Sequence, residues 1–190
     1  EPNLEGSYLL DFGDTLELQL IGQKNQTERL TVKRDGSINI PEIGKIFVSG
    51  LSLESSSDLI KTKIKNAYIG IEAFVTLVNV RDIQVLISGS AYRPGMYTLN
   101  GNSSVLHAIV MAGGISDNGS YREVNVIRNN EVISSIDLYD IFVFGNSGFS
   151  TNLRSGDAIH IPQHKNLVHA VSGINRPMIY ELKEGETFMD

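Results

Sequence analysis

The stretch that decides the fold is VLISGSAYRPGMYTLNGNSSVLHAIVMAGG, residues 85–114. It opens with an apolar run at 85–87 that leads to Gly89, a pattern that predicts a buried strand closed by a residue with a free φ angle. Pro94 and Gly95 follow in the order that the two central positions of a type II turn favour. The stretch therefore predicts a strand and a tight turn.

The second half of the same stretch predicts a returning strand and a helix. The strand is expected over residues 96–99, and Asn102 or Ser103 can cap the helix that follows. Apolar side chains recur one turn apart on one helix face, at Val105, Leu106, Ile109 and Val110. Gly113 or Gly114 provides the left-handed residue that ends a helix. A strand, a turn, a strand and a crossing helix form half of a β-grasp fold, so further strands must follow.

Residues 124–161 are expected to provide those strands, and after them the stretch begins again. The repeated residues are Ser88-Gly89 and Ser172-Gly173, Arg93-Pro94 and Arg176-Pro177, Tyr97 and Tyr180, and Leu99 and Leu182. The second copy stops where the first begins its helix. We therefore expect the sequence to be a fragment of a longer protein.

Composition excludes several classes of function. The 190 residues include 16 basic and 22 acidic side chains, a net charge of −6 that disfavours binding to nucleic acid through its phosphates. Without cysteine there is no disulfide, thiolate metal site or cysteine nucleophile. No apolar run approaches the roughly 18 residues of a membrane helix, and the first residues do not resemble a signal peptide.

The first part of the chain predicts a small mixed α/β domain. Alternation over 15–20 indicates a half-buried strand, and Asp35-Gly36 predicts a hairpin between strands near 29–34 and 38–40. A further strand is expected near 46–48. Ser52 can cap a helix whose apolar residues include Ile60 and Ile64. The run 74–80 is apolar on both faces, which favours an interior strand.

The region after the central stretch predicts a hairpin, a short helix and a final strand. Strands at 124–128 and 132–136 flank Asn129-Asn130, residues that tolerate a positive φ angle. The short helix is expected within 138–144. Gly156-Asp157 then leads into a strand at 158–161, as Gly13-Asp14 does near the start of the chain.

Taken in order, these residues resemble a known family. In the first part the matching residues are Tyr8-Leu9-Leu10, Gly13-Asp14-Thr15-Leu16-Glu17-Leu18, Val32, Asp35-Gly36, Ile38, Ile40-Pro41, Ile43-Gly44, Ile46, Val48, Gly50-Leu51-Ser52 and Glu54. In the second part they are Gly89, Arg93-Pro94-Gly95, Tyr97, Leu106, Ala108, Ala112-Gly113-Gly114, Val126-Ile127-Arg128, Asp137, Leu153, Gly156-Asp157-Ala158-Ile159 and Ile161-Pro162. The set resembles the outer-membrane polysaccharide export proteins of Gram-negative bacteria, the Wza-like family that joins an export domain to soluble-ligand-binding β-grasp (SLBB) domains. Phe12, where proline is common, and Met178, in place of the turn glycine, depart from the pattern.

The resemblance implies an α+β chain in three parts. These are a polysaccharide export domain at 1–82, an SLBB β-grasp domain at 83–165, and the start of a second, truncated SLBB domain at 166–190. It also implies a periplasmic ring of identical subunits, a homo-oligomer that conducts capsular or exopolysaccharide and works with an inner-membrane polysaccharide copolymerase. The lipid-bearing cysteine and the C-terminal helix that the family places at the outer membrane are expected outside this sequence.

Two alternatives stay open at this point. One is a periplasmic β-grasp ligand-binding or accessory protein of the same secretion pathway that forms no pore. The other is an enzyme acting on polysaccharide, but the sequence has no catalytic motif and its close carboxylates lie in turns. We expect no enzyme activity and no cofactor.

Four residues are candidates for contact with sugar or with a neighbouring subunit: Tyr92, Arg93, Tyr121 and Arg122. Aromatic rings stack on sugars and arginine donates paired hydrogen bonds, yet both residue types also mark protein interfaces. Three histidines, at 160, 164 and 169, lie close in sequence. Their spacing around Pro162 does not suit a metal, so ordinary structural histidines are expected.

Overall fold

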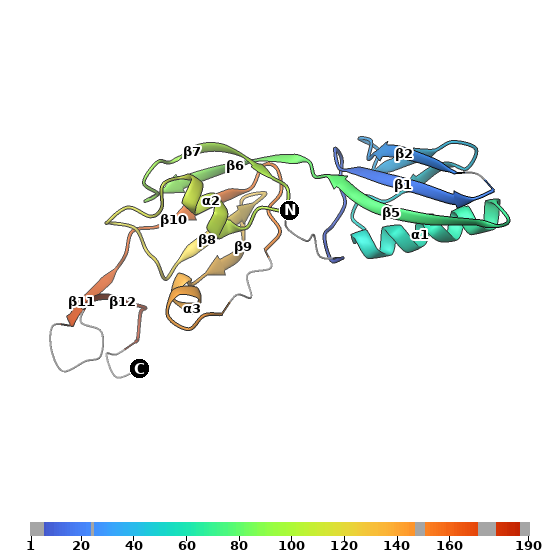
Figure 1. Cartoon of the computed structure of the whole chain (residues 1–190). Helices are drawn as coiled ribbons and strands as arrows, with labels where there is room; N and C mark the ends of the chain where they lie inside the picture. The colour runs from blue at the N-terminus through green and yellow to red at the C-terminus, as the bar shows by residue number, and fades with distance from the viewer. Residues whose placement is uncertain (1–5, 24, 147–150, 171–177, 187–190) are drawn as a thin grey trace. The chain divides into compact units, whose positions relative to one another are not determined.

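The computed structural model describes residues 6–23, 25–146, 151–170 and 178–186 of the 190-residue chain. It divides into two compact units, Glu1–Asp82 and Ile83–Asp190. Both units combine helix with sheet (Figure 1), which confirms the expected α+β class.

The first unit contains a three-stranded antiparallel sheet ordered β2-β1-β5, a separate β3–β4 hairpin and one long helix. Its elements are β1 (Thr15–Gly22), β2 (Gln26–Thr31), β3 (Ser37–Ile40), β4 (Gly44–Phe47), α1 (Leu53–Ala67) and β5 (Ile71–Asn79). In Figure 1 the helix α1 runs along the sheet close to β5. The core forms between these elements.

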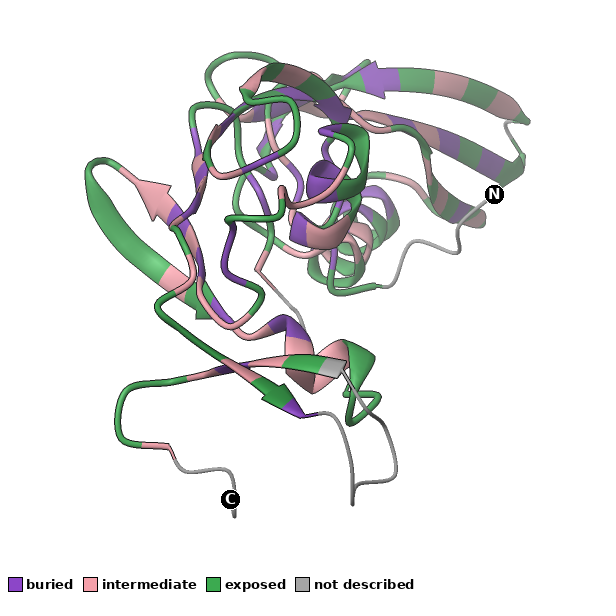
Figure 2. Cartoon of the chain, turned by 90° about the vertical axis from the view of Figure 1, so that its left-hand side faces the viewer, coloured by how far each residue is buried: buried purple, intermediate pink, exposed green. Residues whose placement is uncertain are grey.

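Alternation and capping account for the central elements of this unit. Leu16, Leu18 and Leu20 are buried on one face of β1, as the pattern predicts, and Figure 2 shows the alternation as bands along the strands. The hydroxyl oxygen of Ser52 accepts a hydrogen bond from the Ser55 backbone N–H and caps α1. One face of α1 buries Ile60, completing a core of aliphatic side chains.

Two sequence predictions in this unit are wrong. Asp35-Gly36 does form a turn, but β2 ends at Thr31 and β3 pairs with β4 rather than with β2. The strand β5 lies at the edge of its sheet rather than in the interior, and its outward side chains Phe74 and Val78 are 44% and 43% exposed. Apolar residues on both faces of a strand therefore did not mean burial on both faces.

The second unit is built on a five-stranded sheet ordered β7-β6-β10-β8-β9. Its elements are β6 (Asp82–Gly89), β7 (Gly95–Asn100), α2 (Val105–Met111), β8 (Val124–Arg128), β9 (Glu131–Ile136), α3 (Leu138–Phe142) and β10 (Ala158–Ile161). The central strand β10 is parallel to β6 and antiparallel to β8. Val105, Ala108 and Ile109 of α2 are buried in the core that this sheet forms. The predicted strand–strand–helix unit with added strands is therefore present.

The turn between β6 and β7 differs from the prediction. Gly95 has no positive φ angle, which a type II turn requires at that position, and β7 begins at this residue. Instead, the backbone N–H groups of Tyr92 and Arg93 donate to the carbonyls of Gly114 and Ala112. The end of α2 therefore holds this loop in place.

Helix ends and the later hairpin follow the sequence closely. The N-cap of α2 is Ser104, one residue beyond the two candidates. Gly113 and Gly114 end the helix with φ angles of 82° and 96°, which confirms the predicted stop. Asn129 and Asn130 have φ angles of 50° and 68° in the predicted β8–β9 turn.

A buried aspartate fastens the start of β1 in the first unit. The Asp14 carboxylate is fully buried and accepts hydrogen bonds from the Asp11 N–H (2.8 Å), the Tyr8 hydroxyl (3.0 Å), and the backbone N–H and guanidinium of Arg81 (both 2.8 Å). Burial, together with the charge of Asp14, raises the pKa of Tyr8, so this phenol remains a donor. The first turn is thereby joined to the segment after β5.

The same device recurs at the start of β10. The Asp157 carboxylate accepts both Nε and Nη2 of Arg128 at 2.8 Å and the Arg154 N–H at 2.7 Å. Both aspartates follow a glycine with positive φ, and each takes a hydrogen bond from the N–H three residues before it. The recurring Gly-Asp pair thus predicts a recurring structure.

The second unit ends with a separate hairpin of β11 (Asn166–Ala170) and β12 (Met178–Leu182). These strands pair antiparallel, with Val168 opposite Tyr180. The repeated residues Ser172-Gly173 and Arg176-Pro177 lie outside the described residues. Met178, which departs from the family pattern, is the first residue of β12.

We predict that Gly89→Ala destabilises the second unit. Gly89 has a φ angle of 77°, and an added Cβ would lie 2.1 Å from the Ile161 carbonyl oxygen in the neighbouring strand. The left-handed conformation alone costs a non-glycine residue about 1–3 kcal/mol. Gly95→Ala is the matched control, since its φ is not positive and its Cβ meets no atom within 4 Å. Thermal unfolding of both variants checks this, and equal melting temperatures would contradict it.

We also predict that Asp157→Asn lowers the free energy of unfolding by about 2–3 kcal/mol, because Arg128 loses its charged, bidentate partner. The exposed Asp117 serves as the control, and Asp117→Asn is expected to change stability by less than about 0.5 kcal/mol. Urea unfolding measures both. A loss at Asp157 no larger than at Asp117 would show that the buried pair contributes nothing.

Candidate functional site

Arg122 is the centre of an ion cluster in the second unit. Its Nε donates to Asp137 at 2.9 Å, and its Nη1 and Nη2 donate to the two carboxylate oxygens of Glu186, each at 2.9 Å. Lys183 adds a second cation, with Nζ 2.7 Å from Asp137. The guanidinium also lies over the Tyr139 ring, 4.7 Å from its centroid. The cluster joins the segment before β8 and α3 to the residues after β12.

Glu181 connects β12 itself to the same place. Its carboxylate accepts the Ser120 hydroxyl at 2.6 Å and the Tyr121 N–H at 2.8 Å. Its backbone carbonyl accepts Arg122 Nη1 at 3.0 Å, and its N–H donates to the Tyr139 hydroxyl at 2.9 Å. The backbone and the side chain of one residue are thus both held.

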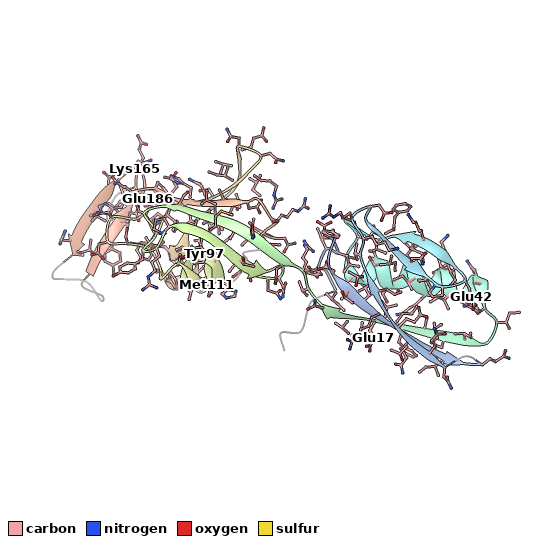
Figure 3. All side chains as sticks on the ribbon, turned by 90° about the horizontal axis from the view of Figure 1, so that it is seen from above. Glu17, Glu42, Tyr97, Met111, Lys165 and Glu186 are labelled. Atoms are coloured by element: carbon pink, nitrogen blue, oxygen red, sulfur yellow. The ribbon has the colours of Figure 1, made fainter. Side chains whose placement is uncertain are left out.

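A polar cavity of about 320 Å³ lies beside this cluster. Its lining comes from the segment before β8, from β9, from the chain after β10 and from β12 onwards: Ser120, Arg122, Glu123, Ser135, Gln163, Lys165, Glu181, Leu182, Lys183 and Glu184. Figure 3 labels Lys165 and Glu186, which lie at this end of the unit. Hydroxyls, an amide and charges of both signs suit a polar ligand better than an apolar one.

The other pair of candidate contact residues lies on the surface. Tyr92 is 67% exposed and Arg93 is also exposed, in the loop before β7. The Tyr92 ring packs over Gly113, and the Arg93 carbonyl accepts the Tyr97 hydroxyl at 2.7 Å. Of the four candidates, Tyr121 and Arg122 are therefore brought together near the cavity, while Tyr92 and Arg93 stand at the end of α2. Their contact with sugar or subunit stays a prediction.

Within the described part of the chain, no three histidine, cysteine or acidic residues are placed so that they could hold one metal ion. The Nδ1 atom of His160 lies 3.1 Å from the Ser88 hydroxyl, across the β6–β10 pair. Among the described helices, none is long and apolar enough to span a membrane.

The comparisons with known proteins follow the two structural units. Residues 2–81 match the family described as polysaccharide biosynthesis/export protein, and residues 83–161 match the SLBB domain. The two matches meet where the units meet. The chain thus joins a polysaccharide export domain to an SLBB domain, in the order found in the Wza-like polysaccharide export proteins. This confirms the family resemblance found in the sequence.

Two curated relatives of this export protein are both named polysialic acid transport protein KpsD, from Escherichia coli. Each is 27% identical to the export protein over 179 residues, which is 93% of this chain. The matched region is 32% of either relative's length. The export protein thus corresponds to about a third of those proteins.

Sequence reasoning missed the partners of Arg122 in the export protein. Asp137 was matched only to the family pattern, and Glu181, Lys183 and Glu186 carried no signal beyond their charge. A comparison of the two copies of the repeat could have found them, because Glu181, Lys183 and Glu186 differ from their counterparts in the first copy. That comparison requires the two copies to be aligned beyond Leu182.

We predict that the export protein loosens its β11–β12 hairpin in acid. Burial would raise the pKa of Asp137, but hydrogen bonds from Lys183 and Arg122 outweigh it and hold that pKa below its ordinary value. The N–H of Lys183 and the Arg122 guanidinium likewise lower the pKa of Glu186. A lowered carboxyl pKa contributes stability that is complete above the unfolded value of about 4 and is lost as the pH falls through the folded value.

Hydrogen exchange of the amides in β11 and β12 tests this. Protection, corrected for intrinsic rates, should be constant from about pH 5 to 8 and fall below about pH 4. The double variant Asp137→Asn, Glu186→Gln should lack this dependence. Equal protection in wild type at about pH 3 and pH 6 would contradict the prediction.

Proposed function

We propose that this chain is the periplasmic part of a polysaccharide exporter whose identical subunits form a ring around a passage for capsular or exopolysaccharide. The observation that carries the proposal is the order of the two matched domains, export domain then SLBB domain, over most of the chain. A relative named for polysialic acid transport supports a polymer as the cargo. The polymer passes through without a bond being made or broken.

The proposed partners follow from this role. The periplasmic ring receives polymer from an inner-membrane polysaccharide copolymerase, and outer-membrane anchoring comes from segments of a longer protein. The matched region covers 32% of the relatives' length, which leaves room for such segments. The net charge of −6 is compatible with a periplasmic surface that avoids nucleic acid.

A surface of the SLBB domain suits contact between subunits. The end of α2 and the adjacent loop present exposed apolar side chains at Tyr92, Val110 and Met111, with the exposed Arg93 beside Tyr92. Tyrosine, methionine and arginine are enriched in protein interfaces. A surface that contacts a different surface on the next subunit generates a closed ring when the rotation closes. We call Tyr92, Arg93, Val110 and Met111 the α2-end surface.

The test is made in the host that carries the gene. Deletion should leave polymer trapped inside the cell, and a plasmid copy of the full-length gene should restore surface polymer. Purified full-length protein in detergent should form closed rings in electron micrographs. Polymer on the surface of the deletion strain would refute a role in export. If the deletion strain does trap polymer but the purified protein is strictly monomeric, the accessory protein without a pore is favoured.

A surface variant makes the ring prediction specific. Met111→Ser, which removes a 52% exposed apolar side chain from the α2-end surface, should reduce the ring fraction and surface polymer several-fold without lowering the melting temperature. Val132→Ser, at a 59% exposed position on β9, is the matched control and should have neither effect. Equal effects of both variants would show that this surface is not a specific contact.

A further inference from the structure

The β11–β12 hairpin carries a buried carboxylate, Glu181, whose hydrogen-bond partners lie outside its two strands. Glu181 lies in β12 and is 7% exposed, although a two-stranded hairpin cannot bury a side chain by itself. Burying a carboxylate is costly unless it is fully hydrogen-bonded. Among the described residues, the partners of its two oxygens lie outside the hairpin, at Ser120 and Tyr121. The carboxylate therefore stabilises the contact between the hairpin and the first β-grasp domain.

Ser120 and Tyr121 are arranged to donate hydrogen bonds to a carboxylate. Ser120 is 2% exposed, and its hydroxyl oxygen accepts the N–H groups of Arg122 (3.1 Å) and Glu123 (3.0 Å). A serine hydroxyl has two acceptor positions and one hydrogen. Because both acceptor positions are used locally, the hydrogen points to Glu181, 2.6 Å away. The Tyr121 N–H adds a second donor, so this segment presents two fixed donors to one carboxylate.

Further contacts fix the direction of the hairpin. Arg122 binds the Glu181 carbonyl and the Glu186 carboxylate, while Lys183 reaches Asp137. Glu181 in β12 and Lys183 and Glu186 after it are thus each held by a charged group of the first β-grasp domain. Charge-assisted and bidentate hydrogen bonds of this kind depend strongly on geometry.

The first copy of the repeat lacks these residues. Aligned on Tyr97 with Tyr180 and on Leu99 with Leu182, the three docking positions Glu181, Lys183 and Glu186 correspond to Thr98, Asn100 and Ser103. The β-grasp hairpin β6–β7 therefore forms without them. Their presence in the second copy alone matches a role in docking.

We infer that Ser120, Tyr121, Arg122, Asp137 and Tyr139 form a docking site for the hairpin of the following β-grasp repeat, selected by its Glu181 carboxylate. The site holds two consecutive repeats as one rigid body and rejects a first-copy hairpin, whose threonine would leave the two donors without a charged acceptor. This assignment concerns how repeats are joined within a chain, and it does not depend on polymer export or ring formation.

The experiment exchanges residues between the copies in the 190-residue chain. Glu181→Thr introduces the first-copy residue, and Glu184→Thr, at an exposed glutamate three residues further on, is the matched control. Two-stranded hairpins are marginally stable alone, so the exchange of β11 and β12 amides reports on docking. We expect exchange at least about tenfold faster in Glu181→Thr than in wild type or Glu184→Thr, with β6 and β8 amides unchanged.

Ser120→Ala gives an independent measurement from the opposite side. It should accelerate exchange of the hairpin as Glu181→Thr does, and the double variant should be no faster than either single variant because both remove the same interaction. Wild-type exchange of the hairpin in Glu181→Thr, or fully additive effects in the double variant, would overturn the docking site. If Ser120→Ala also releases the β8 amides, Arg122→Lys, which keeps the charge but loses the bidentate geometry, must still accelerate the hairpin alone.

Discussion

The structure depends on buried aspartates that collect donors from distant parts of each unit. Asp14 accepts hydrogen bonds from a phenol, two backbone N–H groups and a guanidinium, which come from both ends of the export domain, from Tyr8 to Arg81. Asp157 draws on Arg128 and on its own turn in the SLBB domain. A buried carboxylate tolerates no missing partner. Each aspartate therefore fixes where a strand begins and which segments must close around it.

Local rules predicted the elements whose cause is local. The alternating leucines of β1, the serine cap of α1, the two asparagines of the β8–β9 turn and the glycines that end α2 are each governed by near neighbours. The sequence predictions that failed concern residues whose structure is set by tertiary contacts. Gly95 takes no positive φ because the end of α2 holds the preceding loop, and β5 is an edge strand whose neighbour among the described strands is β1.

The sequence predicted the candidate site with a similar limit, because its contacts are also tertiary. Tyrosine and arginine beside each other at 121–122 indicated a contact, which is a property of residue type. The structure assigns the Arg122 guanidinium to Asp137 and Glu186 within the same unit, a pairing that only the folded chain brings together. The sequence repeat located the hairpin that Arg122 binds, but not the acidic partners of Arg122, since Glu186 stands where the first copy has Ser103 and Asp137 lies outside the repeated residues. Differences between repeats were as informative as identities.

The position of β10 has a consequence for how the SLBB domain folds. This strand is made last in the domain's sheet and lies between β6 and β8, which are made much earlier. A chain that emerges from its N-terminus keeps the inner edges of β6 and β8 unpaired until residues 158–161 arrive. Non-local pairing of this kind slows folding. The export domain closes when β5 pairs with β1, whereas the SLBB domain stays open to aggregation until Ile161 has reached its place.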